Sequence, residues 1–191
     1  MILDFNDETG YLLPGCYKCS IDEFKQRFVD DFPESKSRES RFKGFVEYSR
    51  YICRNVKSTR KQLIDGSFTT KKIDPNDIDF VIIINSCEMT EEEYSFIENE
   101  CIQEDLRKDI YRALKKYVEA GTMDINELYC CDSYIIVRRE PNEGKLYDEW
   151  LEEKAYWLNQ WGHSRPDKET FISHPKGIIE LKMDANVFEG I

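Results

Sequence analysis

The chain lacks both a long hydrophobic run and a basic leader at its start. No stretch approaches the roughly 18 uncharged apolar residues of a membrane helix, and the opening residues MILDFNDETG carry acids where a signal peptide carries bases. The seven cysteines have no regular spacing, so a disulfide framework is not indicated. These absences predict a cytoplasmic protein with no disulfide bonds and no membrane partner.

Histidine is scarce, which limits the catalytic classes. The two histidines, His163 and His174, lie in one late loop, and Gly66-Ser67 lacks the G-x-S-x-G frame of a serine hydrolase. A catalytic triad is therefore not expected. The lone pair Cys16-x-x-Cys19 has no second pair and no clustered histidine beside it, so a zinc or redox site is not expected either.

Positive charge is in deficit, which argues against strong non-specific binding to DNA. The 191 residues include 27 Lys and Arg against 38 Asp and Glu, a formal net charge of −11, whereas non-specific binding depends on cations that neutralise phosphates. The distribution is uneven, because residues 36–72 hold eleven bases and three acids (+8), which leaves −19 on the remainder. This basic window is either the solvated face of a helix or a surface that attracts phosphate.

Apolar periodicity predicts helices and strands that alternate along the chain. Three- and four-residue spacing and capping boxes predict helices over residues 20–29, 37–56, 90–120 and 147–161. Within the third, an apolar stripe consists of Leu106, Ile110, Ala113, Leu114, Tyr117 and Val118. Short apolar runs predict strands over residues 62–65, 78–84, 131–138 and 177–183.

These elements predict an α/β or α+β fold, a mixed β-sheet with helices packed against it. At 191 residues and 40% hydrophobic content, the chain is long enough for one substantial core. We expect a single domain over residues 1–191. The N-terminal helices 20–56 and the C-terminal helix-loop-strand segment 146–184 would pack on its core.

Two aspartates at the start of the 78–84 strand carry the main chemical signal. Alternate strand residues point to one face, so Asp77 and Asp79 present both carboxylates together, about 7 Å apart at Cα. Like charges beside an apolar strand are unfavourable unless a cation or hydrogen bonds compensate. The pair therefore predicts a site for Mg²⁺ or Mn²⁺. The surrounding segment lacks the Gly and distal Glu of an EF-hand.

A Gly-Ser turn precedes this pair and is suited to phosphate. The NH groups of Gly66 and Ser67, with the Ser67 hydroxyl, are placed to hold phosphate oxygens of a nucleoside triphosphate. Lys71 and Lys72, in the loop that follows, are further candidates for phosphate contact. The alternative is that these two are ordinary solvated lysines.

The order of these residues resembles the DNA polymerase beta-like nucleotidyltransferase superfamily. Ile64-Asp65-Gly66-Ser67, nine intervening residues and Asp77-Ile78-Asp79-Phe80 match its pattern of a hydrophobic residue, Gly-Ser, a spacer and Asp-x-Asp. Nearly the whole chain, from residues 5–15 to residues 175–178, also looks like a bacterial family within that superfamily. The resemblance implies the nucleotidyltransferase fold. The family is sometimes compared with toxin or phage-defence nucleotidyltransferases.

The resemblance also implies a third carboxylate on a neighbouring strand. Asp132, just before the apolar run 133–137, is the candidate for this role; otherwise it is a polar residue at a strand entrance, with Asp124 as the substitute. One departure concerns phosphate binding, since Thr69-Thr70-Lys71 stands where minimal nucleotidyltransferases often carry Arg-Gly.

Three functions fit these residues. The first is metal-dependent transfer of a nucleoside monophosphate, from ATP or another triphosphate, to an RNA, protein or small-molecule acceptor. Asp77, Asp79 and Asp132 would hold the metal, and Asp132 would help to activate the acceptor. The second is a nucleotide- or partner-binding module with a degenerate site, for example in a toxin and antitoxin pair or in phage defence. The third is a metal-dependent phosphohydrolase. The loop 162–176 either closes over a ligand or is a plain surface connection.

Overall fold

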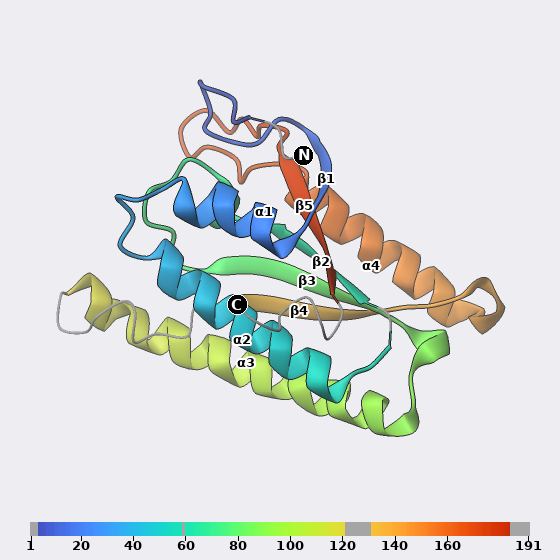
Figure 1. Ribbon diagram of the computed structural model, residues 1–191. Helices are drawn as coiled ribbons and strands as arrows, with labels where there is room; N and C mark the ends of the chain where they lie inside the picture. Colours follow the sequence, from blue (N-terminus) through green and yellow to red (C-terminus); the bar gives the residue numbers. More distant parts are fainter. Residues whose placement is uncertain (1–3, 59, 121–130, 184–191) are drawn as a thin grey trace.

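The computed structural model describes residues 4–58, 60–120 and 131–183. Its centre is a five-stranded sheet in the order β1-β5-β2-β3-β4 (Figure 1). The strands are β1 (Gly15–Cys19), β2 (Arg60–Asp65), β3 (Ile78–Asn85), β4 (Cys131–Arg138) and β5 (Gly177–Met183). Strand β1 is parallel to β5, and β3 is parallel to β4, whereas β2 is antiparallel to both of its neighbours. The predicted mixed sheet with helices is confirmed; strand β1 lies in a segment where the sequence predicted no paired strand.

Within the described ranges, four α-helices accompany the sheet. They are α1 (Ile21–Lys25), continued by a π-helical turn (Gln26–Asp30), α2 (Arg38–Asn55), α3 (Glu91–Glu119) and α4 (Lys145–Trp161). The predicted capping boxes are present. Ser20 Oγ accepts the NH of Glu23 while the Glu23 carboxylate accepts the NH of Ser20, and Thr90 and Glu93 exchange the same two bonds. None of the helices in the described ranges is long and apolar enough to cross a membrane.

The two faces of the sheet have different coverings. Phe80 of β3 points to the side of α2, where its ring centroid lies 5.1 Å from that of Phe45. Next to this pair, Phe24 of α1 stacks on Phe68 at 5.9 Å. Because strand residues alternate, Asp79 points to the opposite face. Helices α1 and α2 therefore bury the apolar face, and the motif aspartate faces the other side.

Three arginines of the basic window are buried, so neither reading of that window applies to them. Arg38, Arg41 and Arg60 are at most 4% exposed. The Arg38 guanidinium donates to the backbone carbonyls of Phe28, Phe68, Thr70, Lys72 and Ile73. Arg38 therefore holds the loop after the Gly-Ser turn against the start of α2.

Candidate functional site

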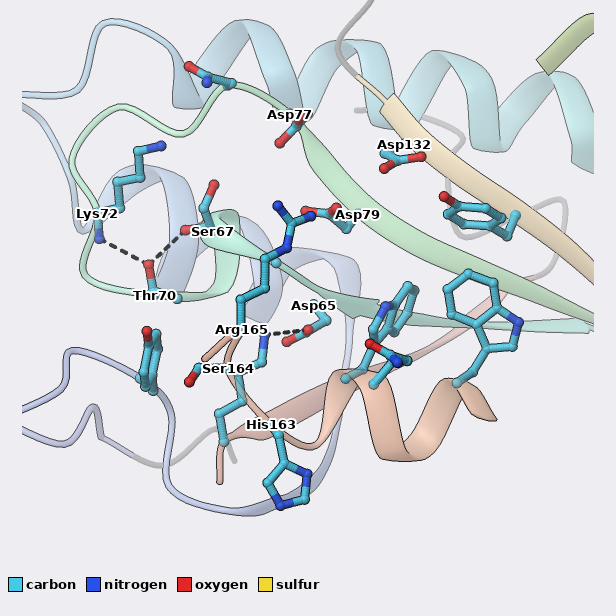
Figure 2. Close-up of a pocket in the computed structure, with 18 of the residues that line it drawn as sticks. Asp65, Ser67, Thr70, Lys72, Asp77, Asp79, Asp132, His163, Ser164 and Arg165 are labelled. Carbon is cyan, nitrogen blue, oxygen red and sulfur yellow. Dashed lines mark hydrogen bonds and ion pairs between the residues drawn. The ribbon is translucent and has the colours of Figure 1, made fainter. Parts of the chain in front are cut away.

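A cavity of about 670 Å³ opens on the face of the sheet that carries Asp79. Its floor comes from the ends of β2, β3 and β4, and its walls come from α4 and the loop between α4 and β5. Most of the predicted site residues line it: Gly66, Ser67, Lys72, Asp77, Asp79 and Asp132. Figure 2 shows the labelled residues around this space.

The sheet register brings three aspartates into one row. Asp79 of β3 pairs with Asp132 of parallel β4 on one side and with Asp65 of antiparallel β2 on the other. Paired residues on adjacent strands point to the same face, and Asp77 lines the same cavity. Asp132 thus lies beside the Asp77 and Asp79 pair, where the sequence placed a third carboxylate. Its substitute, Asp124, lies outside the described residues.

The aspartates repel one another. Burial, followed by the charges of Asp77, Asp132 and Asp65, raises the pKa of Asp79 to about 7. Among the described residues, no donor hydrogen-bonds to the buried Oδ1 atoms of Asp65 and Asp132, although Nζ of Lys108 lies 3.2 Å from that of Asp132 as an ion pair. Hard carboxylate oxygens of this kind suit a divalent cation, which would relieve the repulsion. As the side chains stand, no group of three His, Cys, Asp or Glu in the described ranges is arranged to hold a metal ion.

Gly66 permits the turn to approach these aspartates. Its φ is +79°, and a Cβ built there would lie 1.7 Å from Oδ2 of Asp79. Any side chain at this position would collide with the carboxylate. After Gly66 a 3₁₀ turn (Ser67–Thr69) begins, and the Thr70 hydroxyl donates to the Ser67 carbonyl at 2.8 Å. The Gly-Ser turn is therefore held directly beside Asp79.

The two candidate lysines have different surroundings. Lys72 lines the cavity. The Lys71 ammonium donates instead to Oδ1 of Asp7 at 2.7 Å, on the exposed N-terminal segment. The structure thus brings Lys72, but not Lys71, to the cavity that Asp77 and Asp79 line.

A buried ion pair that the sequence did not suggest borders the cavity. Lys176, just before β5, donates to Oδ2 of Asp65 at 2.5 Å, and both side chains are at most 10% exposed. Burial raises the pKa of Asp65 to about 6 against the opposing effect of Lys176. An acid at the end of an apolar strand was the only local signal for this pair.

A second lysine contacts the third carboxylate. Nζ of Lys108, on α3, lies 3.2 Å from Oδ1 of Asp132 and donates to the Ser133 carbonyl at 2.5 Å. It also lies 3.5 Å from the centre of the Tyr134 ring. A cation on α3 therefore already partly neutralises Asp132.

The late loop and α4 complete the walls. His163, Ser164 and Arg165 of the predicted 162–176 loop line the cavity, and Arg165 extends toward the carboxylates in Figure 2. On α4, Trp157 packs against Tyr134 with ring centroids 4.4 Å apart, and both rings line the cavity. The cavity thus combines a carboxylate floor, a cationic loop and an aromatic wall.

Comparison with known proteins identifies one relationship. A protein-family model described as "Family of unknown function (DUF6932)" matches residues 3–182. No curated protein and no solved structure matches the chain.

Proposed function

The chain belongs to this family of unknown function, and we propose from its site that it is a metal-dependent nucleotidyltransferase with the nucleotidyltransferase fold. One observation carries the proposal. The register that pairs Asp79 with Asp132 places three cavity-lining aspartates, including Asp77, beside the Gly66-Ser67 turn. A metal-binding acid cluster next to a phosphate-binding turn is the minimum that transfer from a nucleoside triphosphate requires.

The reaction is a single displacement at the α-phosphorus. An acceptor hydroxyl oxygen forms the new bond to this phosphorus while the bond to the bridging oxygen of the β-phosphate breaks. Pyrophosphate leaves with the electron pair, and the acceptor proton passes to a carboxylate. We assign the proton to Asp132, which is 35% exposed at the side chain and lies beside the aromatic wall. The products are the nucleotidylated acceptor and pyrophosphate.

The three aspartates supply the metal ligands. Asp77, Asp79 and Asp132 would hold Mg²⁺ or Mn²⁺, which when bound neutralises charge on the transferring phosphoryl group. The protein contributes positioning, because Asp79 and Asp132 are paired on adjacent strands and Asp77 directly precedes β3. Burial, and after it the charges of Asp77, Asp132 and Asp65, raises the pKa of Asp79, and a bound cation would oppose both effects.

Other residues would orient the nucleotide. The NH groups of the Gly66-Ser67 turn and the Ser67 hydroxyl are suited to phosphate oxygens. Lys72 and Arg165 add positive charge on the cavity wall. Tyr134 and Trp157 offer ring faces of the kind on which bases stack. The phosphates of the ligand would therefore lie at the Gly-Ser turn and the late loop, and its base would lie against α4.

The first experiment is calorimetric titration of ATP, GTP, CTP and UTP into the protein with Mg²⁺. We expect the wild type to bind at least one triphosphate and the Asp77→Asn, Asp79→Asn double variant to bind none. The matched control is Asp148→Asn, on the exposed first turn of α4, which should bind like the wild type. A wild type that binds none of the four would remove the basis for the proposal.

A second experiment separates transfer from hydrolysis. The protein is incubated with α-labelled triphosphate, Mg²⁺ and either cellular RNA, protein extract or small metabolites, and the products are resolved. Label on an acceptor, together with free pyrophosphate, supports nucleotidyl transfer. Free nucleoside monophosphate without a labelled acceptor supports the phosphohydrolase instead.

Lys108 favours one alternative function, a binding module with a degenerate site. Its ammonium lies against Asp132, in the position of a cation that the carboxylates would otherwise bind. Such a module would act through a partner, as in a toxin and antitoxin pair. It would bind triphosphate as tightly with EDTA as with Mg²⁺ and would label no acceptor. The calorimetric titration, repeated with EDTA in place of Mg²⁺, and the labelling experiment therefore distinguish it from the enzyme.

A further inference from the structure

Helix α3 turns charged side chains toward β4 and leaves apolar ones outside. Glu104 and Lys108 are 4% and 7% exposed, whereas Leu106 and Ile110 of the predicted apolar stripe are more than half exposed. The Glu104 carboxylate accepts the NH of Ser133, and the Lys108 ammonium donates to the carbonyl of the same residue at 2.5 Å. Strand β4 is the last in the sheet order, so these side chains satisfy backbone groups of an edge strand. The two contacts fix where the Lys108 ammonium lies.

The ammonium lies against one particular oxygen of Asp132. Nζ of Lys108 is 3.2 Å from Oδ1, and this oxygen is buried. The Asp132 side chain as a whole is nevertheless 35% exposed and lines the cavity. Its exposure belongs to the rest of the side chain, so Oδ2 is the carboxylate oxygen that a ligand in the cavity can reach. Figure 2 shows the Asp132 carboxylate across from Asp77 and Asp79.

The surroundings of the ammonium keep it in this place. The centre of the Tyr134 ring lies 3.5 Å from Nζ, and the Tyr134 hydroxyl also interacts with the Asp132 carboxylate. The Lys108 side chain is only 9% exposed. Releasing Oδ1 to another cation would separate a buried charge from its partner, at a high free-energy cost. Asp132 therefore offers one oxygen, not two, to a cation in the cavity.

We propose that Lys108 is a positioning residue that restricts Asp132 to one-oxygen coordination, and that the site thereby selects Mg²⁺ or Mn²⁺ against Ca²⁺. The inference rests on the proposed function, in which Asp132 is a metal ligand. Mg²⁺ takes an octahedral shell of single oxygens, whereas Ca²⁺ takes about six to eight and often binds a carboxylate through both of its oxygens. With Oδ1 held by Lys108, Ca²⁺ loses a contact at Asp132 that the smaller cations do not need.

Two simpler roles for Lys108 lead to different results. If Lys108 only secures α3 to β4, its removal changes the unfolding free energy and leaves the order of cation affinities as it was. If its ammonium only repels cations, its removal raises the affinity for every divalent cation by the same factor, because the charges are equal. Restriction of Oδ1 alone acts on Ca²⁺ more than on Mn²⁺. The ratio of the two affinities therefore distinguishes the three roles.

The test is the affinity of the protein for Mn²⁺ and for Ca²⁺, measured without nucleotide. Free Mn²⁺ is read from its electron paramagnetic resonance signal, and Ca²⁺ affinity from the displacement of bound Mn²⁺. We expect the wild type to bind Mn²⁺ at least about tenfold more tightly than Ca²⁺, and Lys108→Met to reduce this ratio about tenfold. Arg112→Met is the control, because Arg112 is exposed on the same helix and pairs with Asp109. It should keep the wild-type ratio.

A second variant and the wild type itself complete the test. Lys108→Arg keeps a cationic donor for Oδ1 and should retain the preference for Mn²⁺. If Lys108→Met changes both affinities by one factor, or neither, the role given to Lys108 is refuted. Should Lys108→Met fail to fold, as judged by circular dichroism, equal affinity of the wild type for Mn²⁺ and Ca²⁺ would refute it as well. A wild type that binds neither cation alone also overturns this inference, whereas the proposed function is decided separately by the titration with triphosphate.

Discussion

At the scale of single residues, Gly66 links the backbone to the chemistry. Its positive φ turns the chain from β2 into the Ser67 turn, and the missing side chain leaves room for the Asp79 carboxylate. Gly144 also has a positive φ, of +59°, but a Cβ there would meet nothing within 4 Å. Both glycines thus have a backbone conformation that other residues rarely adopt. Only at Gly66 would a side chain also collide with a neighbour, the Asp79 carboxylate.

We therefore predict different costs for alanine at the two positions. Gly144→Ala should lose about 1–3 kcal/mol of unfolding free energy from backbone strain alone. Gly66→Ala should lose a further 1–3 kcal/mol or so from overpacking against Asp79, and it should also lose triphosphate binding. Urea denaturation and the calorimetric titration measure both effects. Equal losses of stability in the two variants would contradict the close contact between the turn and Asp79.

The sequence indicated some of the residues that meet at the cavity, whose roles stay a prediction. The spacing of Gly66, Asp77 and Asp79 is a local pattern, and Asp132 followed from strand order. Asp65 and Lys176 are separated by 111 residues, and no local pattern indicates that such a pair meets. Lys108 was missed for the same reason, because only the packing of α3 against β4 brings it to Asp132.

At the scale of elements, capping boxes and apolar runs predicted the boundaries of several helices and strands well. The capping box at Ser20, the helix 38–55 and the strands 131–138 and 177–183 follow from side-chain patterns that act within one turn or one strand. Which face of α3 is buried did not follow from the sequence. An apolar stripe indicates a helix, but which side is buried depends on the charged network with β4, which is a tertiary property.

Arg38 gives an element-scale prediction, because it connects α2 to the loop after the Gly-Ser turn. It is 1% exposed and donates to five backbone carbonyls. Since a hydrogen bond from a charged donor contributes about 1.5–3 kcal/mol, we predict that Arg38→Met loses more than about 3 kcal/mol of unfolding free energy in urea.

The matched control for this prediction is Arg54→Met, an exposed position at the other end of the same helix. An exposed substitution of this kind should change the unfolding free energy by about 0.5 kcal/mol or less. If Arg38→Met is as mild as Arg54→Met, the loop is held by other contacts and Arg38 is not its anchor.

At the scale of the whole molecule, the carboxylates with shifted pKa values include two groups, one at the site and one on the surface. Four aspartates border one cavity, and burial and mutual repulsion raise the pKa of Asp79 to about 7 and, mainly through burial, that of Asp65 to about 6. Elsewhere the pKa values of Asp7, Asp74, Asp167 and Glu143 are lowered by hydrogen bonds. The site carboxylates and the surface carboxylates therefore affect stability in different pH ranges.

The sign of the effect follows from linkage. A carboxyl whose pKa is higher in the folded state binds protons more tightly there, so stability decreases as pH rises from its unfolded pKa to its folded one. For Asp79 this window runs from about 4 to about 7, and for Asp65 from about 4 to about 6. The surface groups with lowered pKa values act the other way, and they lose their contribution only below their ordinary range, near pH 4.

We predict that, with EDTA present, the unfolding free energy decreases as pH is raised from 5 to 7, and that Asp79→Asn removes most of this slope. Histidine ordinarily titrates in the same window, so both proteins carry His163→Gln and His174→Gln. Mg²⁺ should raise the unfolding free energy more at pH 7 than at pH 5, because it competes with protons for the same oxygens. If Asp79→Asn keeps the full slope, the repulsion at the site is not what opposes folding at neutral pH, and the physical case for a cation among these aspartates is lost.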